Sequence, residues 1–307
     1  MSAERQPSHD VSVVIASVES EHSIGACIDS IRKALAGLSA EVFVVDASRD
    51  GTAEIASERI GRGRVVQCVP GTLTPELWAT GIAQTTGRIV ALTTGHFVVE
   101  PRWIASLTSA LTDRTVGVAG HVALAADANV TDWAVFYLRY SEFLNEPARS
   151  LGEVPGIPAD NAAYEGDAVR RFVRTTGDGF WEVEFHRQAH AEGRTLALVE
   201  GATARYGRSF PFSTILAHRF HHGRHAGAWR ARHGQRSALV ILLAAPAVPL
   251  LLATRVWQRV RGSADHRRRF LRSLPRFMAL AASWAVGEAF GALLGAPAAR
   301  RPTPALA

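Results

Sequence analysis

An alternation of strand-like and helix-like segments, beginning at Val11, is the feature that most constrains the fold of this chain. The run VSVVIA (residues 11–16) is apolar and β-branched throughout, which is typical of a strand buried on both faces. Similar runs recur, and segments with helical spacing of apolar residues separate them; the strand-like runs are 41–46, 64–69, 88–93 and 115–124, and the clearest helices are 23–35 and 75–86. This order predicts right-handed crossovers and an α/β fold with a mostly parallel sheet flanked by helices.

Small and polar residues follow three of these strands. They lie at residues 16–19, 46–48 and 93–96. The carboxyl ends of parallel strands meet at one edge of a sheet, and ligands of open α/β sheets bind at that edge. The pattern therefore predicts that three segments spread over 80 residues form one site.

The pattern becomes less regular after residue 124. Residues 133–144 predict an aromatic-rich helix, and residues 152–164 predict a loop interrupted by Pro and Gly. An amphipathic helix is expected within residues 179–193, closed by Gly193, and a further strand at residues 195–199.

Charge is distributed unevenly along the chain. Residues 1–200 carry 17 Lys and Arg against 26 Asp and Glu, whereas residues 201–307 carry 17 Arg against only Asp265 and Glu288. The basic part predicts an anionic partner, such as a diphosphate, an anionic membrane lipid or a nucleic acid. Since no basic face with interleaved aromatic residues is evident in residues 1–200, we expect no nucleic-acid partner.

Two apolar segments predict a helical hairpin in residues 231–307, after a first domain in residues 1–230. Residues 237–254 contain no charge, and residues 277–295 contain only Glu288. Their lengths are at the lower end for a membrane span of about 20 residues. We expect the hairpin to associate with a membrane; the alternative is a buried hairpin of a soluble protein.

The residues around the hairpin refine this expectation. Eight arginines lie between the two apolar segments and would remain on the cytoplasmic side, while Pro246 and Pro249 interrupt the first segment. A re-entrant or interfacial hairpin reconciles these features. Glycines at 287, 291 and 295 form a small-residue stripe that lets two helices approach closely, and Glu288 is expected to pair with Arg255 or Arg276 as a structural tie.

Several stretches resemble the inverting family 2 glycosyltransferases, which have the GT-A fold. The opening VSVVIASVESEHSIGACIDSI and EVFVVDASRDGTAEIA resemble that family, and so do TTGRIVALTTGHFVVEPRWIASL, PADNAAYEGDAV and GFWEVEFHRQAHAEG, in the expected order. The resemblance covers roughly residues 10–225. It implies a nucleotide-sugar donor of the UDP-linked kind, an acceptor hydroxyl and, usually, Mn²⁺ or Mg²⁺.

The resemblance also implies roles for residues on the donor side. Asp46 matches the strand-end aspartate that accepts hydrogen bonds from the base, and Ser17 and Glu19 match the loop that flanks the nucleoside. Thr94 and His96 stand where the family carries the two acids of its DXD element. Three roles remain open for His96: a metal ligand, a hydrogen-bond donor to phosphate, or a residue at the edge of the site without a catalytic role.

Further roles follow from the same resemblance. Glu182 matches the general base that takes the proton of the acceptor, and Asn161, Tyr164 and Trp181 are expected on the acceptor side. In the stretch HRFHHGRH, the side chains of Arg219, His222 and Arg224 are expected to neutralise the leaving diphosphate; the alternative is a solvated basic patch.

The sequence thus predicts a glycosyltransferase at the cytoplasmic face of the cell membrane, with a glycan or lipid-linked glycan as acceptor and a role in envelope polysaccharide or glycolipid synthesis. The absence of both DXD acids leaves open a catalytically silent relative that binds nucleotide sugar or acts as a scaffold at the membrane. A binder of anionic polymers, driven by the basic tail, is a further alternative.

Overall fold

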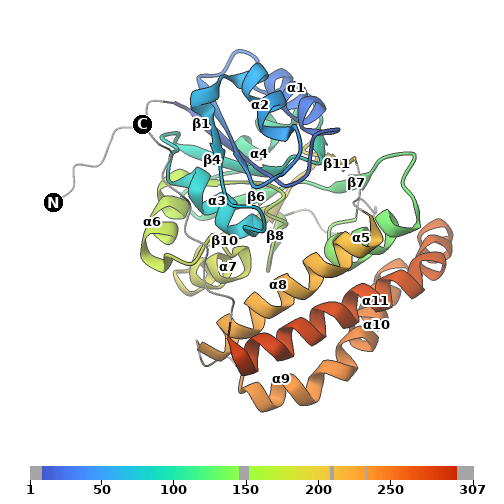
Figure 1. Ribbon diagram of the computed structural model, residues 1–307. Helices are drawn as coiled ribbons and strands as arrows, with labels where there is room; N and C mark the ends of the chain where they lie inside the picture. The colour runs from blue at the N-terminus through green and yellow to red at the C-terminus, as the bar shows by residue number, and fades with distance from the viewer. Residues whose placement is uncertain (1–8, 145–151, 208–210, 233, 235, 296–307) are drawn as a thin grey trace. The chain divides into compact units, whose positions relative to one another are not determined.

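The computed structural model describes residues 9–144, 152–207, 211–232, 234 and 236–295 (Figure 1). The chain divides into two compact units. The described part of unit 1 falls within residues 9–123 and 143–207, and that of unit 2 within residues 124–142 and 211–295. The division expected at residue 230 falls inside helix α8 (Phe212–Arg232), which belongs to unit 2 as a whole.

Unit 1 is built on an eight-stranded sheet, and this confirms the predicted α/β class. The strand order is β3 (Val65–Gln67), β2 (Ala40–Asp46), β1 (Val11–Ser17), β4 (Ile89–Thr94), β9 (Asn161–Glu165), β6 (Thr115–Ala119), β10 (Thr195–Leu198) and β8 (Gly152–Val154). Only β9 and β8 run antiparallel to their neighbours. The strands β1 and β4 are buried along their whole length, as expected for strands covered on both faces.

Two strand predictions were wrong in detail. Residues 152–164, expected to be a loop, contain β8 and the start of β9, and β9 lies in the middle of the sheet between β4 and β6. The single strand expected at residues 115–124 is divided into β6 and β7 (Val122–Leu124). The strand β7 belongs to a second sheet of three strands, with β11 (Ala204–Tyr206) and β5 (Phe97–Val99).

Helices cover both faces of the large sheet. The main core lies on the face of α3 (Thr74–Ile82), α6 (Gly166–Thr176) and α7 (Glu182–Ala191), whose apolar side chains pack on β1, β2, β4 and β9. Helices α1 (Ile24–Ala34) and α4 (Trp103–Ser109) contact each other on the other face, and α2 (Thr52–Ile60) adjoins β2 and β3 (Figure 1). A short 3-10 turn, η1 (Arg62–Arg64), leads into β3.

The start of α3 shows how the sequence fixes these positions. Pro75 in its first turn needs no hydrogen-bond donor, and the Glu76 carboxylate accepts the N–H of Leu73 over 2.8 Å. Further along, the indole N–H of Trp78 donates to the carbonyl of Thr93 at the end of β4, over 2.9 Å. Helix α3 is thereby tied to the strand that ends at the predicted site.

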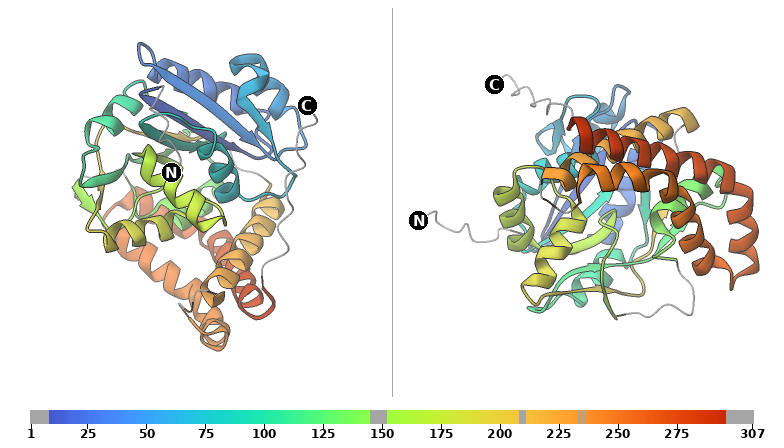
Figure 2. Two further views of the ribbon diagram at one scale, coloured as in Figure 1. Left: turned by 90° about the vertical axis from the view of Figure 1, so that its left-hand side faces the viewer. Right: turned by 90° about the horizontal axis from the view of Figure 1, so that it is seen from below.

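Unit 2 is helical. It contains α5 (Val130–Tyr140), α8, α9 (Ala238–Ala244), the 3-10 turn η2 (Ala245–Ala247), α10 (Val248–Val260) and α11 (Ala264–Leu294). The predicted hairpin is confirmed as α9–α10 followed by α11, and the predicted break at Pro246 is confirmed as η2. Helix α11 runs beside α8, which the views in Figure 2 also show.

Glycines on both helices allow this contact. A Cβ atom on Gly291 would lie 1.8 Å from the carbonyl oxygen of Arg224, and one on Gly227 would lie 1.9 Å from that of Glu288. A Cβ atom on either of two further glycines, Gly223 and Gly287, would lie 2.1 Å from a carbonyl oxygen of the opposite helix. The predicted glycine stripe therefore exists at 287 and 291, but its partner is α8, and Gly295 lies outside it at the end of α11.

The expected partner of Glu288 was wrong. Its buried carboxylate pairs with Arg230 of α8 rather than with Arg255 or Arg276. The ion pair is therefore a structural tie between α8 and α11, and not between the two arms of the hairpin. This outcome follows from the glycine contact, which brings Glu288 against α8.

Candidate functional site

Three neighbouring parallel strands of unit 1 end together. Ser17 of β1 is the register partner of Asp46 of β2, and Ala16 is the partner of Thr94 of β4. The N–H of Gly95 continues this pairing by donating to the carbonyl of Ala16 over 2.9 Å. The prediction that residues 16–19, 46–48 and 93–96 share one edge is thereby confirmed.

Hydrogen bonds join the two loops that follow β1 and β2. The N–H of Glu19 donates to the Ser48 hydroxyl over 2.7 Å, and the N–H of Arg49 donates to the Glu19 carboxylate over 3.1 Å. The N–H of Ser20 also donates to the hydroxyl of Thr52, over 2.9 Å. Glu19 itself has a φ of 49°, a left-handed conformation that non-glycine residues rarely adopt. The bonds on both sides hold it there, so the edge presents a fixed backbone rather than two separate loops.

Asp46 is a buried carboxylate at the end of β2 on this edge, with 2% of its surface exposed. Its oxygens accept hydrogen bonds from the Ser48 hydroxyl over 2.6 Å and from the Ser48 N–H over 3.3 Å. Burial raises the pKa of Asp46 above 3.8, and the bonds from Ser48 partly offset that rise. A carboxylate held in this way can accept an N–H group of a ligand that excludes water from the edge.

His96 lies in a polar cage at the turn after β4. Its Nε2 is 3.3 Å from the Ser20 hydroxyl, and its Nδ1 is 3.3 Å from the Ser23 hydroxyl. The ring also meets the edge of Tyr206, with 6.3 Å between centroids. Gly95 permits this approach, because a Cβ there would lie 2.8 Å from the hydroxyl of Ser20. Hydroxyls both donate and accept, so the cage suits neutral and protonated imidazole alike.

The donors at the end of β4 do not suit a hard divalent cation. Mg²⁺ prefers several oxygen ligands, usually including carboxylates, whereas this turn offers Thr94 and an imidazole whose two nitrogens already face Ser20 and Ser23. Within the described part of the chain, no three His, Cys, Asp or Glu side chains are grouped so that they could hold a metal ion. Binding of Mn²⁺ or Mg²⁺ by His96 therefore stays a prediction. The donor atoms present at this turn do not favour it.

Glu182 is the first residue of α7 and is half-buried. The turn before it is attached to α3, because the N–H of Phe180 donates over 2.8 Å to a carbonyl in the first turn of that helix. The N–H of Cys68 donates to the carbonyl of Asp46 over 2.7 Å, and burial, with the charges of Asp46 and Glu76, raises the pKa of the Cys68 thiol. The turn that carries Glu182 is therefore attached to α3, the helix whose Trp78 donates to the carbonyl of Thr93 at the end of β4.

The residues expected on the acceptor side lie in different surroundings. Asn161 is fully buried. Its amide oxygen accepts the indole N–H of Trp103 over 2.6 Å, and its amide nitrogen donates to two backbone carbonyls. Tyr164 is also fully buried, and its hydroxyl lies 3.3 Å from Nε2 of His186. Of the expected set only Trp181, beside Glu182, is partly exposed. The direct role of Asn161 and Tyr164 toward an acceptor stays a prediction, and their contacts are those of core residues.

Asp160 is an acid that the sequence analysis did not single out. It precedes β9, which is antiparallel to β4 with Asn161 opposite Thr93, so Asp160 lies beside the end of β4. Only 2% of its surface is exposed. Burial raises the pKa of Tyr164 well above 10, and the charges of Glu182 and Asp160 raise it further. Recognising β9 as a strand would have revealed Asp160 at the edge.

The basic residues of α8 belong to unit 2. Burial lowers the pKa of Arg219 to about 9 and that of His222 well below 6.5, and in both cases the charge of Arg139 lowers it further. The buried Nε of Arg219 has no hydrogen-bond partner among the described residues. Arg224 has a structural contact instead, since its Nε donates over 3.2 Å to the carbonyl of Gly295 at the end of α11. The predicted diphosphate role of these three residues stays a prediction.

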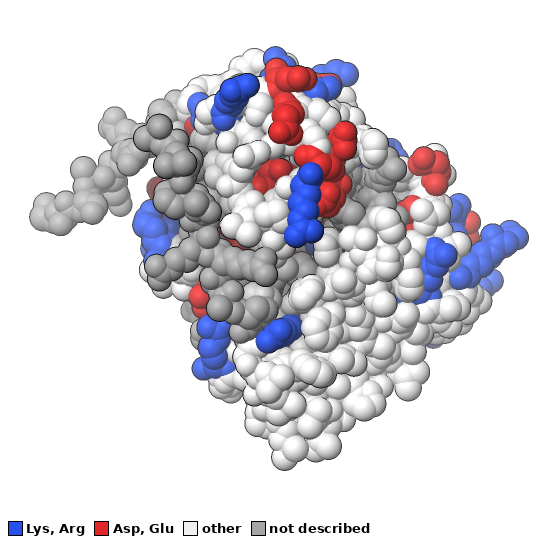
Figure 3. Space-filling view, viewed as in Figure 1, with Lys and Arg blue, Asp and Glu red and all other residues white. Residues whose placement is uncertain are grey.

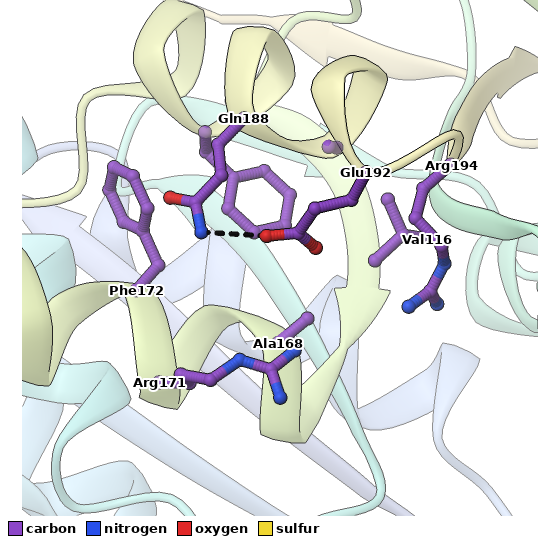
Figure 4. Close-up of a pocket in the computed structure, with 9 residues that line it drawn as sticks. Val116, Ala168, Arg171, Phe172, Gln188, Glu192 and Arg194 are labelled. Carbon is purple, nitrogen blue, oxygen red and sulfur yellow. Dashed lines mark hydrogen bonds between the residues drawn. The ribbon is translucent and has the colours of Figure 1, made fainter.

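A small hollow in unit 1 lies away from this edge (Figure 4). Val116 at the start of β6 and Arg194 just before β10 line it, together with residues of α6 and α7. Gln188 donates to Glu192, one turn further along at the end of α7, over 2.9 Å. Since Val116 and Arg194 mark the amino ends of their strands, the hollow lies at the edge opposite Asp46 and is not the candidate site.

A mostly parallel sheet with helices on both faces and polar loops at its carboxyl edge is the architecture of nucleotide-binding α/β proteins. The chain belongs to glycosyl transferase family 2, whose family model matches residues 12–172. The match ends before Glu182. Together with the sheet topology it confirms the predicted GT-A fold.

Comparison with solved structures finds glycosyltransferase-like folds at low identity. The chain is similar to glucosyl-3-phosphoglycerate synthase from Mycobacterium tuberculosis in complex with Mg²⁺ and uridine diphosphate, with 19% identity, a TM-score of 0.44 and coverage of 68% of this chain and 75% of that one. It is also similar to residues 1–349 of S. aureus TarS in complex with UDP-GlcNAc, with 10% identity, a TM-score of 0.49 and coverage of 88% and 90%. With TM-scores below 0.5, neither likeness adds to the family assignment. No curated protein matches the sequence significantly.

Proposed function

We propose that this family 2 glycosyltransferase moves a sugar, with inversion, from a UDP-linked donor to an acceptor hydroxyl. The observation that carries the proposal is the shared edge of β1, β2 and β4, where Ser17, Asp46 and Thr94 end neighbouring strands and two hydrogen-bonded loops surround Asp46. This edge supplies the nucleoside site that the family requires.

Asp46 acts on the base of the donor. Uracil presents an N–H donor, and an ionised carboxylate can only accept, so the two groups are complementary. Ser17 and Glu19 flank the nucleoside from the loop after β1. For the imidazole of His96 to donate to a phosphate oxygen, its ring must turn so that one nitrogen leaves the hydroxyl of Ser20 or Ser23. We also assign neutralisation of the diphosphate to Arg219 and His222. This part of the proposal is supported by the chemistry of the two side chains and not by their positions.

Glu182 acts as the general base. Its carboxylate takes the proton of the acceptor hydroxyl while that oxygen forms a bond to the anomeric carbon. The bond between this carbon and the diphosphate oxygen breaks with its electron pair, and the nucleoside diphosphate leaves. One displacement of this kind inverts the anomeric configuration. No step is assigned to a metal ion, because the donors at Thr94 and His96 do not favour one.

Donor binding by an Asp46→Asn variant tests the proposal. Isothermal titration of UDP-glucose, UDP-GlcNAc and UDP-galactose against the full chain should show binding of at least one donor, weakened about tenfold or more by the substitution, since a charged hydrogen bond contributes about 1.5–3 kcal/mol. Asp50→Asn is the matched control, because Asp50 is in the same loop but its carboxylate accepts the N–H of Thr52. Equal binding by the two variants would contradict the role of Asp46.

A second candidate function is nucleotide-sugar binding without turnover. The donor set at Thr94 and His96 favours it, since it lacks both acids of the DXD element. The two candidates differ in one result: the silent protein binds a donor and releases no UDP with any acceptor, whether or not Mn²⁺ is added.

The acceptor and the location form the last part of the proposal. We place the protein at the cytoplasmic face of the cell membrane, acting on a lipid-linked or envelope glycan. Two helical stretches of unit 2, Ala238–Val260 and Ala264–Leu294, are long and apolar enough for a membrane by length and composition. An acceptor carried by a lipid would be presented at the same surface.

A further inference from the structure

Unit 2 exposes many large apolar side chains. In the first apolar stretch, Ala238–Val260, only 17% of the residues in the most apolar window are buried. The exposed apolar side chains, here called the apolar face, come from α9, α10 and the second half of α11: Leu239, Val240, Leu242, Leu243, Leu250, Leu251, Val286, Phe290, Leu293 and Leu294. Figure 3 shows a broad area without charged side chains over α9 and the adjoining parts of α10 and α11. Soluble monomers rarely expose so large an apolar patch.

Arginines gather where α10 passes into α11. Six of them are exposed, and the five nearest the turn are here called the basic rim: Arg255, Arg261, Arg267, Arg268 and Arg272; the sixth is Arg276. Figure 3 shows blue side chains at this end of the hairpin. Anionic lipid headgroups attract such a group next to an apolar surface. The charge therefore favours a bilayer rather than a protein as the partner of the apolar face.

The packing of α8 against α11 indicates whether the hairpin crosses the bilayer. The close glycine contacts run from Gly223 to Gly227 on α8 and from Gly287 to Gly291 on α11, so the two helices lie side by side over the most apolar part of α11. In or next to this stretch α8 carries Arg224 and Arg230, the second of which pairs with Glu288. If α11 crossed the bilayer in this arrangement, these side chains would enter the hydrocarbon. Such insertion is unfavourable for ionised groups.

We propose that unit 2 is a one-sided membrane anchor, in which α9, α10 and the outer side of α11 lie in the plane of one leaflet of an anionic bilayer without crossing it. The apolar face enters the boundary between headgroups and acyl chains, and α8 remains on the aqueous side of α11. The turn at Gly262 is then on the same side of the membrane as unit 1. The inference rests on the proposed membrane location, but not on donor binding or turnover.

Labelling of cysteine variants tests sidedness. Cys68→Ser removes the half-buried thiol, while Cys27 is retained because its burial raises its pKa to about 12 and makes it unreactive. Gly262→Cys and Glu58→Cys, each in this background, place an exposed thiol in the turn and in unit 1. In sealed inverted membrane vesicles, an impermeant maleimide should label both to the same extent without detergent. Labelling of Gly262→Cys only after detergent means that the hairpin crosses the bilayer, and this overturns the proposal.

Vesicle binding tests the partner itself. The full chain should float with vesicles of phosphatidylglycerol and phosphatidylcholine, and a Leu243→Gln, Leu250→Gln variant should bind at least tenfold more weakly. Leu38→Gln, at an exposed leucine of unit 1, is the control and should bind as the parent does. Absence of flotation, or a dimer in solution that covers the apolar face without binding vesicles, overturns the proposal. Both results leave donor binding untouched, so they are distinguishable from failure of the glycosyltransferase proposal.

Discussion

At the scale of single residues, Asp46 combines a functional carboxylate with an unfavourable environment. Its side chain is buried, and the bonds from Ser48 offset only part of the cost of burying the charge, so its pKa is raised. Functional sites often retain such groups at the expense of stability. Replacing the carboxylate should therefore weaken donor binding without lowering stability.

Asp46→Asn should leave the melting temperature at pH 7 unchanged or higher. An acid whose pKa is raised on folding binds more protons in the folded state, so its contribution to stability decreases as the pH rises from about 3.8 through the raised pKa. The difference in melting temperature between variant and parent should grow over that window and then level off. A lower melting temperature of the variant at pH 7, with no difference from the parent at low pH, would contradict the raised pKa of Asp46.

The sequence predicted the residues of the donor edge because the register of parallel strands follows from the strand pattern. Asp46, Thr94 and Ser17 each end a strand, and the strand order fixes their positions. Asn161 and Tyr164 could not be placed in this way, since the short strand β9 is antiparallel to its neighbours and follows a Pro- and Gly-containing segment. The cage around His96 depends on Ser20, Ser23 and Tyr206, which sequence distance does not bring together.

At the scale of elements, α7 is held against β9 by an aromatic group around a histidine. His186 stacks on Tyr164 with 6.2 Å between ring centroids and contacts Phe185 edge to face. Burial, and to a lesser extent His190, lower the pKa of His186 to about 3. The imidazole is thus neutral at pH 7 and behaves as part of the core that positions Glu182.

His186 should make unit 1 sensitive to acid. Below pH 6.5 the imidazole binds a proton in the unfolded state but not in the folded state. The free energy of unfolding therefore decreases as the pH falls from 6.5 toward 3. Between pH 7 and pH 5 this amounts to about 2 kcal/mol for one such group. In urea unfolding at the two pH values, His186→Phe should lose most of this difference, and His22→Phe, at an exposed site, should retain it. Equal pH dependence in both variants would show that His186 is not the cause.

The close contact of α8 with α11 predicts that a side chain added at the interface destabilises unit 2. Gly291→Ala would place a Cβ 1.8 Å from the carbonyl oxygen of Arg224, so the helices must separate. Overpacking of this kind costs about 1–3 kcal/mol. The calorimetric transition of unit 2 should move to lower temperature, and Gly262→Ala, which has open space around it, should leave it in place. An unchanged transition in Gly291→Ala would contradict the close packing.

The hairpin was predictable from the length and composition of its two segments, whereas its partner was not. Gly223 and Gly227 are surrounded by His and Arg in a sequence that reads as a polar helix. Only the structure shows that the glycines leave the backbone bare on one face of this helix, and that this face packs on α11. For the same reason the partner of Glu288 was sought in the hairpin rather than in α8.

At the scale of the whole molecule, the acidic and basic parts of the chain correspond broadly to unit 1 and unit 2. The excess of arginine in residues 201–307 that the sequence shows is concentrated in α8, α10 and α11. The proposed membrane contact therefore has an electrostatic part that salt should screen, in addition to the apolar part that salt should not weaken.

Removing two arginines of the basic rim should separate these contributions. Each basic residue near an anionic membrane contributes about 1 kcal/mol. The Arg268→Gln, Arg272→Gln variant should therefore bind phosphatidylglycerol vesicles about 30-fold more weakly than the parent at low salt, with a smaller difference at 0.5 M salt. Glu54→Gln, Glu58→Gln in unit 1 is a control for charge changes elsewhere. An equal loss of binding to uncharged vesicles would contradict the electrostatic part.

The central claim, that the carboxyl edge of unit 1 transfers sugar with Glu182 as base, is tested most directly by turnover. Release of UDP from the donor that binds is measured for the full chain in native membranes, which contain the acceptor, with Glu182→Gln and the control Glu184→Gln. Glu184 lies in the same helical turn but pairs with Arg187. The account predicts turnover reduced about 100-fold or more in Glu182→Gln, with donor affinity retained, and little change in Glu184→Gln. Donor binding without turnover in the parent, or equal turnover in the two variants, would contradict it.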